Sequence, residues 1–189
     1  MKPAALALCA SVALVGCGSS PEPTFYALAP SHGAAQPGAP RAIRIRRLAI
    51  PPYLDRPEVV RGLVNHRLAI AADERWGAPL DEMLGRVLAE DVEQRSPGSL
   101  VFSETGAISV DADATVEVDL QRLEVDPSGE VTLVADVAVE RGQAHTASAS
   151  RAVNLKKSPS AAGTPGLVAA MSDLVGELAD QITALLRAG

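Results

Sequence analysis

The stretch ATVEVDLQRLEVDPSGEVTLVADVAV, residues 114–139, alternates apolar and polar side chains on both sides of the turn Asp126-Pro127-Ser128-Gly129. Alternation with a period of two is typical of a strand with one buried face, and these turn residues favour a tight reversal. A third strand is expected from Gln143 to Val153, after a turn at Glu140-Arg141-Gly142. Together the three strands predict an antiparallel meander.

Two segments repeat apolar residues at three- and four-residue steps, which is the spacing of amphipathic helices. The first begins at Pro79, a residue that suits the first helical position, and ends near Ser96-Pro97-Gly98. The second runs from Pro165 to Arg187, and Thr164 can cap it. Its apolar stripe favours a helix packed on the core, and a helix against a membrane surface or a partner is the alternative.

Shorter segments complete the fold. Residues 42–50 predict a strand, residues 59–72 a hairpin with turn points at Gly62 and Asn65-His66, and residues 100–102 a short buried strand. The order of strands, helix, strand, meander and helix predicts an α+β fold. In this fold both helices pack against a mixed, mostly antiparallel sheet.

The amino terminus has the pattern of a bacterial lipoprotein signal. Its apolar run, Ala4 to Val15, is too short for a transmembrane helix of roughly 20 residues but suits a signal peptide. The string Leu14-Val15-Gly16-Cys17 resembles a lipobox. We therefore expect residues 1–16 to be removed as the signal peptide, and Cys17 to carry diacylglycerol and an amino-terminal acyl chain.

Cys17 is the only cysteine that this processing leaves, because Cys9 lies in the signal peptide. A lone thiol in an exported chain has no disulfide partner within that chain, which favours its use as an anchor. The residue after Cys17 is Gly18 rather than Asp, and by resemblance to enterobacterial sorting rules this favours the outer membrane. We expect a lipid-anchored protein on the periplasmic face of the outer membrane.

Residues 17–41 form a stretch rich in Pro, Gly and Ser, which predicts a tether between the lipidated cysteine and a single domain of residues 42–189. An apolar island, Phe25 to Leu28, interrupts this stretch. A second arrangement therefore stays open. In it the island docks on the domain as an edge strand, and only the few residues before the island stay free.

The net charge of the chain argues against a nucleic acid as the binding partner. The formal net charge is −6 at pH 7, whereas nucleic-acid binding depends on clustered Lys and Arg that neutralise phosphates. The one basic cluster is short and consists of Arg41, Arg44, Arg46 and Arg47. We interpret it as a solvated strand edge and expect no nucleic-acid partner.

The sequence offers no catalytic motif. It contains no G-x-S-x-G elbow and no phosphate-cradling glycine loop, and His32, His66 and His145 lack the neighbours of a metal site. We therefore expect no enzyme, no catalytic residue, no metal and no cofactor beyond the lipid on Cys17.

A resemblance to a known family rests on strings between Ile50 and Leu88. These are Ile50-Pro51-Pro52-Tyr53-Leu54-Asp55-Arg56-Pro57, Val59-Val60-Arg61, and Arg75-Trp76-Gly77-Ala78-Pro79-Leu80 with Arg86-Val87-Leu88. They resemble the signature of the ABC-type transport auxiliary lipoproteins, the paraquat-inducible PqiC and YmbA group. Phe25 replaces a usual tyrosine of that family, and Gly77 stands where alanine is common.

The resemblance implies a fold similar to the amino-terminal domain of TolB and a docking or assembly role in an MCE-type lipid transport system. The implied partners are an MCE-domain protein and an inner-membrane ABC transporter complex. The alternative function is a periplasmic lipid-binding carrier, but the few aromatic residues leave no surplus apolar surface to line a cavity. The oligomeric state stays open, a homo-oligomer included.

The candidate site residues all lie in this signature: Tyr53, Asp55, Arg56, Pro57, Arg61 and Trp76. In a structural interpretation, Pro57 fixes the backbone of an irregular loop, and Tyr53 and Trp76 cover the loop. Asp55 would then bond with Arg56 or Arg61. In a functional interpretation, the same residues form a rim for a partner protein, since aromatic residues and arginines commonly anchor interfaces.

Replacing Cys17 with Ser removes the acceptor of the lipid and therefore tests the anchor. We expect the Cys17→Ser chain to appear as a soluble periplasmic protein or as an unprocessed precursor, because acyl chains supply the membrane affinity. Membrane fractionation with immunoblotting measures the distribution. Unchanged recovery with the outer membrane would contradict the anchor.

Overall fold

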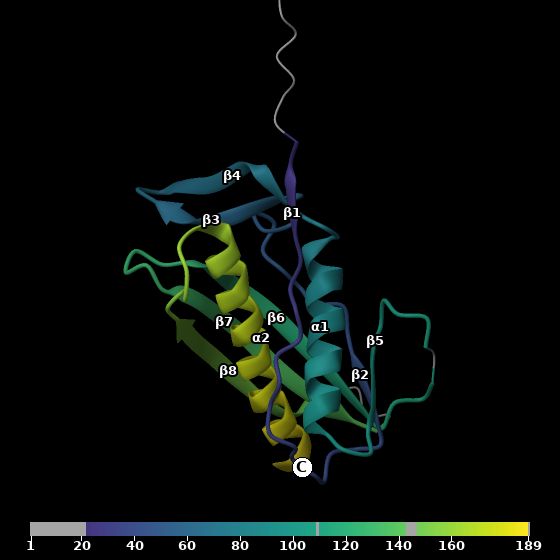
Figure 1. The fold of residues 1–189 in the computed structure, drawn as a ribbon. Coiled ribbons are helices and arrows are strands. Elements are labelled where there is room, and N and C mark those ends of the chain that lie inside the picture. Colours follow the sequence, from purple (N-terminus) through teal and green to yellow (C-terminus); the bar gives the residue numbers. More distant parts are fainter. Residues whose placement is uncertain (1–21, 109, 143–146, 189) are drawn as a thin grey trace, which may run out of the picture.

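The computed structural model describes residues 22–108, 110–142 and 147–188, which form one eight-stranded sheet with two helices on one face (Figure 1). In chain order the elements are β1 (Thr24–Tyr26), β2 (Ala42–Ile45), β3 (Glu58–Val64), β4 (Arg67–Trp76), α1 (Leu80–Arg95), β5 (Leu100–Ser103), β6 (Ala114–Val125), β7 (Val131–Arg141), β8 (Ala147–Lys157) and α2 (Gly163–Ala188). The predicted α+β class is confirmed, with a mixed, mostly antiparallel sheet and both helices packed against it.

Strand β6 connects the parts of the sheet. One edge of β6 pairs antiparallel with β7 along its length. The other edge is shared, because its first residues pair in parallel with β2 and its last residue, Val125, pairs with Gly62 of β3. β7 pairs antiparallel with β8, so the predicted meander is present. Residues 143–146, where its third strand was expected to begin, lie outside the described residues.

The alternation along β6 and β7 decides which face of the sheet is buried. From Ala114 to Leu120 and from Leu133 to Val139 every second residue lies under the helices, and the residues between them lie on the open face. The buried set is Ala114, Val116, Val118, Leu120, Leu133, Ala135, Val137 and Val139. The helices present apolar side chains to this set, Leu84, Val87 and Leu88 from α1 and Met171, Leu174, Leu178 and Ile182 from α2. The prediction that the last helix packs on the core is confirmed.

The hairpin of β3 and β4 closes through Asn65 and His66, whose φ angles are +50° and +63°. Two successive positive φ angles are typical of a type I′ turn, which matches the twist of a two-residue hairpin. The other predicted turn point, Gly62, is wrong, because Gly62 lies inside β3. A Cβ atom added there would lie 2.4 Å from the carbonyl oxygen of Val125, so a glycine is needed where β3 meets β6.

Strand β2 is shorter and more central than expected. It ends at Ile45 and lies between β5 and β6. The interpretation of the arginine cluster as a strand edge is therefore wrong. The guanidinium carbon of Arg44 lies 5.9 Å from the centroid of the Phe102 ring, and Arg46 pairs with Glu117 of β6 on the open face.

The position of β1 decides between the two arrangements of the apolar island, a free tether or an edge strand docked on the domain. It pairs in parallel with β4, with Thr24 opposite Glu74 and Tyr26 opposite Trp76. Leu28, just after β1, is buried against the core. The island is therefore docked on the domain as an edge strand.

Residues 29–41, which we call the strap, run between α1 and α2 on the side away from the sheet (Figure 1). The amide of Ser31 donates to Asp91 Oδ1 of α1 at 2.7 Å, and the amide of Gln36 donates to the Arg95 carbonyl at 2.6 Å. The expectation of a free tether is therefore wrong for this stretch. A Pro-rich backbone that cannot fold by itself obtains hydrogen bonds here from the helices.

The side chain of Arg95 fastens the strap to both helices. It is only 2% exposed, its Nε lies 2.6 Å from Asp180 Oδ1 of α2, and its Nη1 donates to the Ser31 carbonyl of the strap at 2.9 Å. Gly33 of the strap leaves the room for it, since a Cβ atom there would lie 2.2 Å from Arg95 Cζ. A buried guanidinium needs such partners, so the strap is part of what makes this cation tolerable in the interior.

Asp91 is the buried acid beside this cation. Its Oδ1 accepts the Ser31 amide, and its Oδ2 has no hydrogen-bond partner within the described residues. Burial raises the pKa of Asp91 to about 6, and the charges of Glu90 and Asp180 add to this rise. The hydrogen bond from Ser31 and the charge of Arg95 act in the opposite direction and lower the pKa. The carboxyl group therefore changes its charge near pH 6 while it holds the strap.

The raised pKa of Asp91 predicts a loss of stability with rising pH. Between the ordinary pKa of Asp and about pH 6 the folded state keeps a proton that the unfolded state has lost. The free energy of unfolding therefore falls over this window, by on the order of 3 kcal/mol, and stays lower above it. Asp91→Asn removes this titration, so the melting temperature of the variant should rise relative to that of the unchanged protein from about pH 4 to about pH 7.

Calorimetry across this pH range measures the difference. Glu90→Gln, which changes an exposed acid next to Asp91 in α1, is the matched control and should keep most of the drop. An Asp91→Asn variant whose melting temperature follows pH in parallel with the unchanged protein would show that Asp91 does not cause the drop.

Candidate functional site

The candidate residues surround the loop of residues 51–57, which precedes β3. Leu54 anchors this loop in the core, and its amide donates to the Pro51 carbonyl at 2.9 Å. Asp55 and Pro57 are exposed at the surface. The loop is thus fixed from below by an apolar side chain, while its charged and proline residues face solvent.

The two arginines of the signature pair with acids other than the one predicted. Arg56 Nε lies 3.0 Å from Glu58 Oε2, and this hydrogen bond holds the pKa of Glu58 below its usual range. Arg61 Nη2 lies 2.6 Å from Glu74 Oε2. In the part of the chain that the structure describes, neither arginine bonds with Asp55, so the predicted pairing is wrong. The carboxylate of Asp55 is left exposed for a partner.

The two aromatic residues lie below the loop. The amide of Trp76 donates to the Pro57 carbonyl at 2.7 Å, and its indole is buried in the core. Tyr53 is half-buried next to the buried carboxylate of Glu124. Burial raises the pKa of Tyr53 to about 12, and the charge of Glu124 and the hydrogen bond to it add to the rise. Tyr53 therefore keeps its proton and can serve as a hydrogen-bond donor to Glu124.

Arg61 belongs to a second group of polar side chains that the sequence analysis did not find. Its Nε donates to the buried hydroxyl of Thr164 in α2 at 3.1 Å, and this hydroxyl lies 2.5 Å from Glu74 Oε2. The Tyr26 hydroxyl of β1 also approaches Glu74, at 3.4 Å. Burial opposes ionisation of Glu74, but the bonds from Thr164, Arg61 and Tyr26 hold its pKa below the usual range. The group ties β1, β3, β4 and α2 together.

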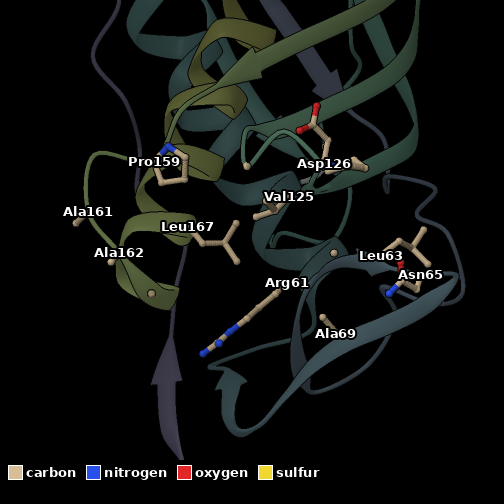
Figure 2. A pocket seen from close by; sticks show the side chains of 14 residues that line it. Arg61, Leu63, Asn65, Ala69, Val125, Asp126, Pro159, Ala161, Ala162 and Leu167 are labelled. Atoms are coloured by element: carbon tan, nitrogen blue, oxygen red, sulfur yellow. The ribbon is translucent and has the colours of Figure 1, made fainter.

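A pocket of about 640 Å³ opens next to this group (Figure 2). It lies between the hairpin, the turn after β6 and the loop before α2, and its walls are mostly apolar, with side chains such as Leu63, Ala69, Val125 and Leu167. Arg61 is the basic residue of its wall. No local pattern predicts this pocket, because its walls come from four separate stretches of the chain that only the fold brings together.

The described residues contain no group of three or more His, Cys, Asp or Glu side chains that could hold a metal ion. Within the same residues, no helix is both long and apolar enough to cross a membrane. Cys17 and His145 lie outside the described residues.

Comparison with known structures finds the same fold, and two of the matching structures are as follows. A structure whose title reads "uncharacterized protein" is 18% identical, with a TM-score of 0.71, and the match covers 87% of this chain and 98% of the other. The protein XCC0632 from Xanthomonas campestris, of the family model DUF330, is 16% identical, with a TM-score of 0.72 and coverage of 87% and 96%. At this identity the likeness shows the fold alone.

Comparison with curated proteins finds no match. A family model described as the ABC-type transport auxiliary lipoprotein component matches residues 26–183. This range runs from β1 into the last helix and includes the loop, the polar group and the pocket. The resemblance found in the sequence is thus confirmed, and the chain belongs to the family of ABC-type transport auxiliary lipoprotein components.

Proposed function

We propose that this transport auxiliary protein is a periplasmic lipoprotein, anchored in the outer membrane, that docks or assembles an MCE-type ABC lipid transport system between the two membranes. The observation that carries the proposal is the family match, which spans nearly the whole described domain. The family is a class of transport components rather than of enzymes. The lipobox at Cys17 supports the anchor, and Gly18 supports the outer membrane as its destination.

The loop of residues 51–57 is the surface that we assign to the partner. Asp55 is exposed and bonds with neither Arg56 nor Arg61 among the described residues, although its charge acts on Arg47. Arg56 pairs with its neighbour Glu58. A backbone held by Leu54 and by the Trp76 amide keeps these charges in place before a partner arrives. Preorganised charged side chains at an interface reduce the entropic cost of binding, so the loop suits docking to a transporter or MCE-domain protein.

Arg56→Ala tests the partner surface. The partly exposed pair with Glu58 contributes little to stability, so the melting temperature should stay near that of the unchanged protein. Lipid transport in cells and capture of the transport complex by a photo-crosslinker placed at Asp55 should both be lost. Arg41→Ala, an exposed arginine outside the loop, is the control and should retain both. Full transport and crosslinking in Arg56→Ala would contradict the docking surface, and a large drop in melting temperature would favour the structural role.

The pocket favours a second candidate, the lipid-binding carrier. The sequence analysis expected no surplus apolar surface, but the structure has a mostly apolar pocket of about 640 Å³. This volume lies in the range of about 300 to 1,000 Å³ that is usual for small-molecule sites. Its walls contain Ala69 and Ala162, two small side chains at which the pocket can be filled by substitution.

Native mass spectrometry of the full chain with Cys17→Ser separates the two candidates. A docking component should give the mass of the protein alone. A carrier should retain phospholipid in stoichiometric amount, and Ala69→Phe should then remove this lipid by filling the pocket. Ala72→Phe is the matched control, because Ala72 is an exposed alanine of the same strand that does not line the pocket. Stoichiometric lipid that only Ala69→Phe removes would overturn the preference for docking.

A further inference from the structure

The β3–β4 hairpin carries a cluster of exposed apolar side chains on its outer face. Leu63 and Leu68 lie opposite each other, and Ile70 is two residues further along β4 on the same face. Their exposed fractions are 44%, 36% and 38%. We call these three residues the hairpin face. Leu63 also lines the pocket, as do Gly62 and Ala69, whereas Leu68 and Ile70 are not among its lining residues. The exposed fractions of the three side chains nevertheless leave the hairpin face open to solvent.

The first described strand, β1, starts at the end of the molecule that carries the β3–β4 hairpin. β1 runs parallel to β4 with Thr24 opposite Glu74, so the start of β1 lies at the end of the molecule that carries the hairpin (Figure 1). Phe25 of β1 is exposed there as well, at 63%. The start of β1 and the apolar hairpin thus share one end of the molecule.

The free tether is short because β1 and the strap are docked. Six residues lie between Cys17 and Thr24, and the seven steps from one to the other span at most about 25 Å when the chain is fully extended. Helix α2 begins next to β1, where Thr164 bonds to Glu74, and its 26 residues extend for about 39 Å. If the domain stood on the membrane with the end opposite the hairpin, Thr24 would lie farther from the membrane than the chain from Cys17 to Thr24 can span.

The charge distribution also favours the hairpin end. Between Glu58 and Trp76 three arginines balance three acids, although the chain as a whole has a formal net charge of −6. The open face of the sheet instead presents acids such as Glu117, Asp119 and Asp136. Anionic headgroups repel acidic surfaces, so the neutral hairpin end can approach a phospholipid surface at lower electrostatic cost.

From these observations we infer that the hairpin face, together with Phe25, contacts the phospholipid surface of the membrane in which the chain is anchored. The inference rests on the proposed lipidation of Cys17. Apolar side chains at the tip of a domain gain free energy by burial at the headgroup boundary, and the covalent anchor keeps them close to it. The domain then stands with its hairpin on the membrane and with its loop of 104–113, at the opposite end of β6, toward the periplasm.

The test uses the mature lipoprotein, reconstituted in vesicles of phosphatidylethanolamine and phosphatidylglycerol. Acylation occupies the thiol of Cys17, so Leu68→Cys supplies the one free thiol for a fluorophore that is sensitive to polarity. The label at Leu68 should lose most of its fluorescence to phospholipids that carry a nitroxide near the headgroup. Ile108→Cys, an apolar position in the loop of 104–113 that is 49% exposed against 36% for Leu68, is the matched control and should keep its fluorescence.

A second variant removes the apolar contact itself. Leu68→Ser with Ile70→Ser should restore the fluorescence of a label at Leu63→Cys, and the melting temperature should change little because both side chains are exposed. Co-flotation with the vesicles and the mass of the amino-terminal peptide report on the anchor separately. Protein that floats with acylated Cys17 but shows equal quenching at Leu68 and Ile108 overturns the inference and leaves the anchor intact. Protein with an unmodified Cys17 that does not float overturns the anchor, and the inference with it.

Discussion

Covering one face of the sheet is the constraint on which the rest of this structure depends. β6 and β7 alternate so regularly that half of their side chains need burial while the other half, such as Glu117 and Asp136, need water. Both helices therefore lie on the same face, and they pack against each other as well as against the strands. The outer side of the two helices is where the strap lies. Packing of the strap is thus a consequence of how the sheet is covered.

The buried guanidinium of Arg95 makes the packing of the strap specific to this place on the two helices. An arginine between two helices is tolerated only where acceptors surround it, and here Asp180 and the Ser31 carbonyl provide them from opposite sides. The strap therefore completes the solvation of a charge in addition to covering apolar surface. As a result, residues 24–41, most of the stretch that its composition predicts to be a tether, are part of the domain.

The family and its solved relatives show which features the fold requires. Two structures share the fold with TM-scores of 0.71 and 0.72 at 18% and 16% identity. An alternating apolar face can be built from many combinations of Val, Leu and Ala, so the architecture persists while most residues change. The features that distinguish this chain lie at its surface and in its pocket. These are the charged loop of residues 51–57, the hairpin face and the space beside Arg61.

The sequence by itself determined the elements, because helices and strands follow from local periodicity. The meander, both helices and the Asn65-His66 turn were predicted close to their observed positions, and so was the α+β class. The resemblance to the transport auxiliary family was also readable, since it rests on short strings. Only the tertiary structure decided which distant residues meet. It paired Arg61 with Glu74 and Thr164, placed β2 inside the sheet and fixed the strap on Arg95. Composition predicts whether a segment can fold alone, and it cannot predict that another part of the chain supplies the missing hydrogen bonds.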